Sequence, residues 1–264
     1  MFYSNLRQEF KGYLKRFKNE DGRFSDPIKI KIGHTLRVVR EIEDLAAGNN
    51  PLDIDTAKCA ALLHDIGRFQ QYATFGTYDD RVSINHAALS LVVIDQLGLL
   101  SEVGQERQRL IRTAIQQHNN EKVSANLNPH ERALSLMLRD ADKLDIWRVI
   151  IEQDRENPIE DNYSEENFER IKQIKGVPYA LAKTRADIRL FRLGWMFDVH
   201  CPQAIAKILS RHYLDDMFSK LPHTERFSEL YLVVKEHLED QLNNPTAQKN
   251  QITLSSSFPV LRNG

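Results

Sequence analysis

Apolar residues recur with a helical period along most of the chain. The first clear case begins at Asp26-Pro27, an N-cap followed by proline, and its apolar face consists of Ile28, Ile32, Leu36, Val39 and Ile42. The same period predicts further helices over residues 53–67, 83–98, 105–118 and 128–150, the second of them ending at Gly67. Residues 69–82 are polar and aromatic, which predicts a loop. No segment alternates as a strand would, so the pattern predicts an all-α fold.

The second half of the chain continues as helices without recognisable chemistry. Residues 152–169 are acidic and rich in Asn, which predicts a loop or a short helix, and helical patterns follow at 178–195, 202–220 and 225–242. Arg185, Arg189 and Arg192 recur at helical spacing and are interpreted as a solvated face, with a phosphate-binding stripe as the alternative. We expect one all-α domain over residues 1–264, a compact helical bundle whose core spans 26–150, with 151–264 as added helices.

The amino-acid composition excludes or disfavours several classes of function. The 264 residues carry 36 Lys and Arg against 37 Asp and Glu, a net charge of −1, which argues against dedicated nucleic-acid binding but leaves room for a small phosphorylated ligand. The two cysteines, Cys59 and Cys201, exclude a disulfide scaffold. No apolar run is long enough for a membrane span, and the N-terminus lacks the apolar core of a signal peptide, so we expect a cytoplasmic protein.

Histidines and aspartates occupy the edges or ends of five predicted helices. Inward-facing residues of neighbouring helices can converge on one point, which is how metal sites form in helical bundles. Imidazole and carboxylate ligands together suit manganese, iron, cobalt, nickel or zinc, and the candidates outnumber the ligands of one tetrahedral ion. Such a site activates water for in-line displacement at phosphorus. The candidate ligands are His34, His64, Asp65, His86, His118 and Asp142.

The order of these residues resembles the HD superfamily of metal-dependent phosphohydrolases. The resemblance rests on two local strings, LLHDIGRF at 62–69 and RDADKLD at 139–145, and it covers about residues 26–150. It implies an HD-type helical bundle and one or two divalent ions among manganese, iron, nickel, cobalt and magnesium. It also implies that His34, His64, Asp65 and Asp142 are metal ligands, that Asp65 is the bridging or water-orienting catalytic carboxylate, and that His86 and His118 match the extra histidines of members with a second metal.

The resemblance implies a nucleotide or another small phosphate ester as substrate. The sequence lacks the motifs that accompany hydrolysis of cyclic di-guanylate, the guanosine alarmone, deoxynucleoside triphosphates or deoxynucleoside 5′-monophosphates, so each of these familiar substrates is disfavoured. Arg68 and Lys143 are the candidate substrate-binding cations. Alternatively, Arg68 caps its helix or pairs with Asp79 or Asp80, and Lys143 is solvated.

Two other functions stay open. Some HD-fold proteins hold two irons through four histidines and two aspartates and oxidise carbon with dioxygen, and this chain offers that ligand count. A non-catalytic module that senses a nucleotide is the third possibility, although the intact ligand set argues against it. The sequence leaves the natural substrate and the oligomeric state open.

Overall fold

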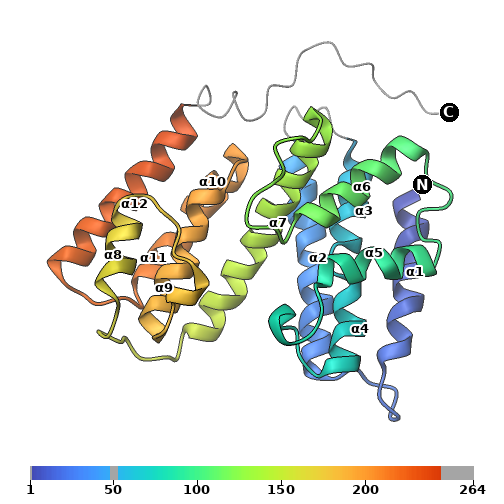
Figure 1. Cartoon of the computed structure of the whole chain (residues 1–264), viewed down its shortest axis with the longest axis horizontal. Helices are drawn as coiled ribbons and strands as arrows, with labels where there is room; N and C mark the ends of the chain where they lie inside the picture. The colour runs from blue at the N-terminus through green and yellow to red at the C-terminus, as the bar shows by residue number, and fades with distance from the viewer. Residues whose placement is uncertain (1, 48–52, 245–264) are drawn as a thin grey trace. The chain divides into compact units, whose positions relative to one another are not determined.

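The computed structural model describes residues 2–47 and 53–244. These residues form α-helices, short 3-10 helices and one isolated bridge between Lys18 and Phe24, with no strand among them, which confirms the all-α fold (Figure 1). The α-helices are α1 (Phe2–Leu14), α2 (Asp26–Ala46), α3 (Ile54–Leu63), α4 (Ile66–Phe75), α5 (His86–Gln96), α6 (Gln105–Gln117), α7 (Pro129–Asp154), α8 (Glu165–Lys172), α9 (Arg185–Gly194), α10 (Pro202–Ser210), α11 (Tyr213–Phe218) and α12 (Glu225–Asn243).

The described residues divide into two compact units, the first ending at Asp142 and the second beginning at Lys143. The expectation of one domain over residues 1–264 stays a prediction, and its part beyond residue 244 lies outside the described residues. In this part of the chain, no helix combines the length and the hydropathy needed to cross a membrane.

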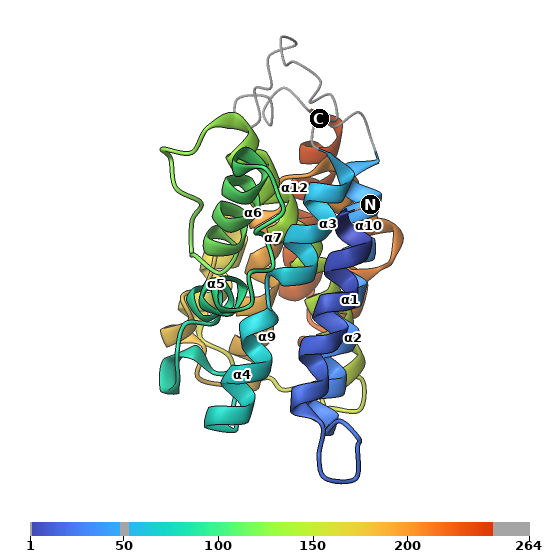
Figure 2. The same ribbon diagram turned by 90° about the vertical axis from the view of Figure 1, so that its right-hand side faces the viewer.

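In the first unit, α3 is the central helix and packs against α1, α2 and α6 (Figure 2). Its small residues Ala57, Ala60 and Ala61 are fully buried, so the neighbouring helices can approach its backbone closely. Leu62 and Leu63 at its end are also fully buried. The end of α3 is therefore held in the core of the unit, and this is where the HD pair lies.

The predicted helix end at Gly67 is wrong, and so is the predicted loop over residues 69–75. Helix α3 ends at Leu63, and α4 begins only three residues later at Ile66 and continues to Phe75. Gly76, with a left-handed φ of 67°, ends α4. Gly67 instead permits a close approach to α5, because a Cβ there would lie 2.5 Å from the backbone nitrogen of Ser90.

The capping residues determine where the helices begin, and these starts differ from the predicted ones by a few residues. Ser25, not Asp26, is the N-cap of α2. Helix α5 begins at His86, because the side chain of Asn85 accepts a hydrogen bond from the amide of Ala88. The predicted start of a helix at residue 128 is confirmed by a reciprocal cap of α7: the Asn128 side chain accepts from the Glu131 amide, and the Glu131 carboxylate accepts from the Asn128 amide.

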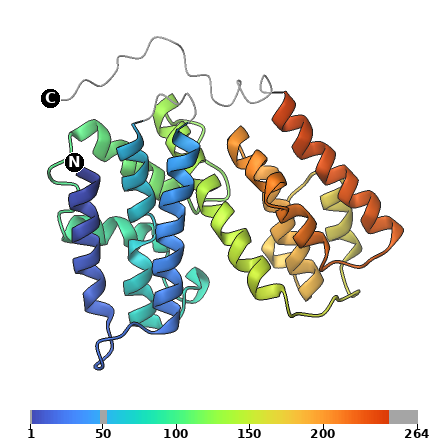
Figure 3. The same cartoon turned by 180° about the vertical axis from the view of Figure 1, so that it is seen from behind.

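In the second unit, α12 packs against α8, α10 and α11 (Figure 3). The predicted helix over 202–220 is divided into α10 and α11 at His212, whose φ is 59°. The interpretation of the arginine stripe as a solvated face is wrong for Arg189, which is 2% exposed and bound to Asp154. Arg185 is exposed, as expected, and pairs with Glu160.

Candidate metal centre

The six residues predicted as ligands come together in the first unit. Five different helices or helix ends supply them, and all six side chains are largely withdrawn from solvent. His34 lies on α2, His64 and Asp65 form the turn between α3 and α4, His86 opens α5, His118 is the C-cap of α6, and Asp142 lies on α7. That these residues bind a metal stays a prediction.

Asp65 lies between two groups of imidazoles. Its Oδ2 atom is 3.5 Å from Nε2 of His34 and 3.4 Å from Nε2 of His64. Its Oδ1 atom is 3.5 Å from Nε2 of His86 and 3.8 Å from Nε2 of His118. One carboxylate thus presents an oxygen to each pair of histidines.

Asp142 completes the first group. Its Oδ1 atom lies 3.1 Å from Nε2 of His34 and 3.7 Å from Nε2 of His64. The ligand atoms of His34, His64 and Asp142 lie within 4.8 Å of one another, and so do those of His64, Asp65 and His118. Both triads have the donor types and the spacing of a site for a divalent transition metal.

Inner atoms of this cluster lack the hydrogen bonds that buried polar atoms normally make. Nε2 of His64, Oδ1 of Asp65 and Oδ1 of Asp142 are inaccessible to solvent, and none of them makes a hydrogen bond within the described part of the chain. Burying such atoms without partners is costly. A cation held between them removes this cost, so the residues present fit a bound metal.

The other ring nitrogen of three histidines is fixed by an acceptor. Nδ1 of His64 donates to the Ala61 carbonyl at 2.7 Å, and Nδ1 of His118 donates to the Ile115 carbonyl at 2.6 Å. Nδ1 of His86 donates to Oδ2 of Asp80 at 2.5 Å. In a neutral ring this leaves the lone pair on Nε2, the atom that points into the cluster. Metal-binding histidines are oriented in this way.

Two of these lone pairs face each other. Nε2 of His86 and Nε2 of His118 are 2.9 Å apart, while both Nδ1 atoms donate elsewhere. Two neutral rings in these orientations would repel each other, so the contact requires a shared proton or a shared cation. The second group of imidazoles therefore also fits a positive ion.

The electrostatics of the cluster favour positive charge. Burial opposes protonation of His64, but the carboxylates of Asp65 and Asp142 outweigh it and raise the pKa of His64 to about 10. Burial likewise opposes ionisation of Asp65, yet Lys31 and His64 hold the pKa of Asp65 well below its usual range. Two ionised carboxylates in a buried site demand a compensating cation, which a divalent metal supplies.

The contacts of three residues around the cluster were not predicted from the sequence. Lys31 donates to Oδ2 of Asp65 at 2.8 Å, and Arg139 donates to the backbone carbonyls of Gln117 and His118 at the end of α6. Asp80 binds His86, as described above. Lys31 precedes His34 by one helical turn, so their shared helix face was the available signal. Arg139 begins the string at 139–145 and Asp80 was named as an alternative partner of Arg68, but their contacts with α6 and with His86 join different elements, which no local pattern predicts.

The two predicted substrate-binding cations are engaged in different ways. Arg68 donates to the Asp80 carboxylate at 2.7 Å, and its Nε lies 3.6 Å from Oδ1 of Asp65, so it borders the cluster. Lys143 belongs to the second unit, where it donates to the Asp198 carboxylate at 2.5 Å. Contact of either residue with a substrate stays a prediction.

Comparison with known protein families gives one match. Residues 32–147 match the HD domain, and this range contains all six candidate ligands. Neither the curated proteins nor the solved structures include a significant match to the chain.

Proposed function

Because residues 32–147 of this chain are an HD domain, we propose that the protein is a metal-dependent phosphohydrolase. Its substrate in this proposal is a nucleotide or another small phosphate ester. The observation that carries the proposal is the buried convergence of four imidazoles and two carboxylates, in which Nε2 of His64, Oδ1 of Asp65 and Oδ1 of Asp142 lack hydrogen bonds among the described residues. A structural polar cluster would satisfy those atoms within the chain.

The ligands divide naturally between two ions. His34, His64 and Asp142 would hold one divalent cation, and His86 and His118 would hold a second, with Asp65 presenting an oxygen to each. Bound divalent metal lowers the pKa of water towards neutrality and offsets negative charge on phosphoryl oxygens.

Chain residues then position the reactants. Asp65 lies at the centre of the cluster, where its carboxylate orients the attacking water and balances the positive charge. Lys31 is partly exposed and contacts Asp65, so its ammonium is placed to meet a phosphoryl oxygen at the edge of the buried site. Arg68, also next to Asp65, and Lys143 remain our candidates for further substrate contacts.

The proposal is tested by metal analysis combined with hydrolysis assays. We expect purified protein to retain or take up Mn²⁺, Ni²⁺, Co²⁺ or Fe²⁺ and to hydrolyse at least one ester in a panel of nucleotides and small phosphate esters. His64→Ala and Asp65→Ala should each abolish turnover. Asp79→Asn, in an exposed ion pair with Arg81, is the matched control and should retain it. Metal-dependent turnover that persists in both alanine variants would refute the proposal.

The ligand count also supports a second candidate, a diiron oxygenase. Four histidines and two aspartates in one cluster match what such HD-fold proteins use. Hydrolysis with Mn²⁺ under anaerobic conditions favours the phosphohydrolase. Two irons per chain with turnover that requires dioxygen favours the oxygenase, and stoichiometric nucleotide binding without product favours a sensing module.

A further inference from the structure

His86 differs from His64 and His118 in how its ring is held. His64 and His118 lie at helix C-terminal ends, and each ring donates to a carbonyl three residues earlier in its own helix. His86 is the first residue of α5, so no preceding helical turn offers it a carbonyl. Its orientation has to come from another element.

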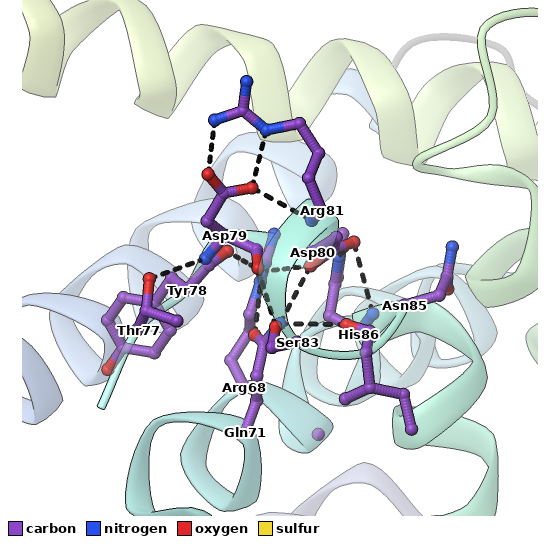
Figure 4. A network of polar contacts seen from close by, with 12 residues as sticks. Arg68, Gln71, Thr77, Tyr78, Asp79, Asp80, Arg81, Ser83, Asn85 and His86 are labelled. Carbon is purple, nitrogen blue, oxygen red and sulfur yellow. Dashed lines mark hydrogen bonds and ion pairs between the residues drawn. The ribbon is translucent and has the colours of Figure 1, made fainter. Parts of the chain in front are cut away.

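That element is the segment between α4 and α5. Asp80, in the 3-10 turn Asp80–Val82, accepts the Nδ1 proton of His86 at 2.5 Å and also its backbone amide at 3.3 Å, both at Oδ2 (Figure 4). We propose that Asp80 is a positioning residue that fixes His86 as a ligand of the second metal. This inference rests on the proposed function, because it needs a metal at the second group.

The Asp80 carboxylate is itself held rigidly. Its Oδ1 atom accepts from the guanidinium of Arg68 at 2.7 Å and from the side-chain amide of Gln71 at 2.9 Å (Figure 4). Gln71 is fully buried and also donates to Ser83 and to the Ile84 carbonyl. Three hydrogen bonds, from Arg68, Gln71 and the His86 backbone amide, thus determine the position of one carboxylate, and through it the direction of the His86 ring.

The carboxylate also changes the chemistry of the ring. A carboxylate acceptor makes an imidazole a stronger metal ligand than a neutral carbonyl does. The negative charge also lies at the N-terminus of α5, where the helix dipole favours it.

Asp80 is not the only anchor of its segment. The Tyr78 hydroxyl donates to the Pro27 carbonyl on α2, and the side-chain amide of Gln71 on α4 donates to the Ser83 hydroxyl and to the Ile84 carbonyl. Removing the Asp80 carboxylate therefore leaves the segment attached at three other points. The effect of such a change on metal binding can be separated from an effect on the fold.

The test is a titration of the full chain with Mn²⁺, in which the signal of free Mn²⁺ measures how much of the ion stays unbound. We expect the wild type to bind two ions. Asp80→Ala should leave one affinity unchanged and weaken the other by about 10–100-fold, as loss of a carboxylate behind a metal-binding histidine does. Asp80→Asn keeps an oxygen acceptor and should show a smaller loss. If Asp80→Ala does not fold, the Mn²⁺ affinities of Asp80→Asn test the inference instead.

Two controls separate positioning from loop stability. Asp79→Asn alters the neighbouring carboxylate, and Tyr78→Phe removes a loop anchor without touching Asp80. Both should bind two ions as the wild type does. Unchanged affinities in Asp80→Ala, a single ion indifferent to that change, or equal losses in Tyr78→Phe would each overturn the inference. Wild type that binds no Mn²⁺ and hydrolyses nothing would instead overturn the proposed function.

Discussion

Each unit of the molecule buries a charged cluster, and the two clusters are built in opposite ways. In the second unit, the guanidinium of Arg189 donates to both oxygens of Asp154 and to the carbonyls of Pro158 and Lys220. In the first, inner atoms of His64 and Asp65 make no hydrogen bond among the described residues. Burial and charge are common to both clusters, and the satisfaction of the polar atoms distinguishes them.

The difference separates a structural role from a ligand-binding role. A buried ion pair with complete hydrogen bonds holds the chain together once its desolvation is compensated. A buried cluster whose inward atoms make no hydrogen bond gains little stability from them in the free protein. Those atoms can instead bind a ligand that the chain does not supply. Changes at the two clusters should therefore affect different measured quantities: stability at Arg189, and metal binding at the candidate centre.

Arg189→Met should produce the largest change in stability. It removes one partner of a buried pair and leaves Asp154 with an uncompensated charge, which costs about 3–5 kcal/mol in comparable cases. Asp142→Asn, the matched change in the metal centre, should cost the metal-free protein less, because its Oδ1 makes no hydrogen bond among the described residues and only its ionic contacts with His34 and His64 are lost. Urea unfolding of the metal-free proteins measures both. Equal losses would remove the distinction between the clusters.

The Arg189 effect should also depend on pH. Burial raises the pKa of Asp154, but hydrogen bonds from Arg189 and Asn157 outweigh it and lower this pKa below its ordinary value of 3.8. The stabilisation is therefore complete above about pH 4 and is lost as the pH falls through the lowered value. Consequently, the stability gap between wild type and Arg189→Met should be constant near neutrality and shrink below pH 4. A gap that widens on acidification would contradict the assignment.

Metal should stabilise the first unit by a predictable amount. An ion that binds only the folded chain, present at about 100 times its dissociation constant, adds about 2.7 kcal/mol to the free energy of unfolding. We expect Mn²⁺ to raise the unfolding midpoint, a chelator to reverse the shift, and Asp65→Asn combined with Asp142→Asn to abolish it. Arg189→Met, although less stable, should keep the same increment. If the doubly substituted protein responds to Mn²⁺ as the wild type does, the ion binds elsewhere.

The candidate ligands could be predicted because each one lies at the edge or end of an apolar helix face. Helical periodicity places His34 and Asp142 towards the core, and the HD pair follows a buried run ending in Leu62 and Leu63. Their order along the chain, together with the local strings, was enough to indicate one site. What periodicity does not contain is the distance between helices: the two groups around Asp65 were implied only by the family resemblance, and the distances that separate them come from the structure.

The errors have a common physical origin in tertiary contacts. Gly67 has the composition signal of a helix end, but its lack of a side chain serves the close approach of α5. Arg189 repeats at the spacing of a solvated face, but its partner lies 35 residues earlier at Asp154. Asp80 lies in a polar segment that predicts only a turn, and its contact with His86 depends on how that segment folds back.

Gly67→Ala tests how closely the metal centre depends on the packing of α4 against α5. The new Cβ would meet three backbone atoms, the Ser90 nitrogen at 2.5 Å, the Leu89 carbonyl carbon at 2.8 Å and the His86 oxygen at 2.9 Å. Backbone cannot rotate away, so overpacking should cost about 1–3 kcal/mol. Because α5 carries His86, the second Mn²⁺ should also bind more weakly. Gly12→Ala on α1, where nothing lies within 4 Å, is the control and should not weaken either property.

The smallest effect should come from the cap of α7, the helix that carries Asp142. Asn128→Ala removes the side-chain acceptor for the Glu131 amide at 3.0 Å and should cost about 1 kcal/mol. Asp142 lies more than three turns further along, beyond the reach of a frayed first turn, so Mn²⁺ affinity should stay at the wild-type value. Urea unfolding and Mn²⁺ titration on the same preparation check both. A fall in Mn²⁺ affinity without a fall in stability would mean that the start of α7 helps to place Asp142. Metal binding in the first unit would then depend on distant helix packing more strongly than the contrast with Arg189 implies.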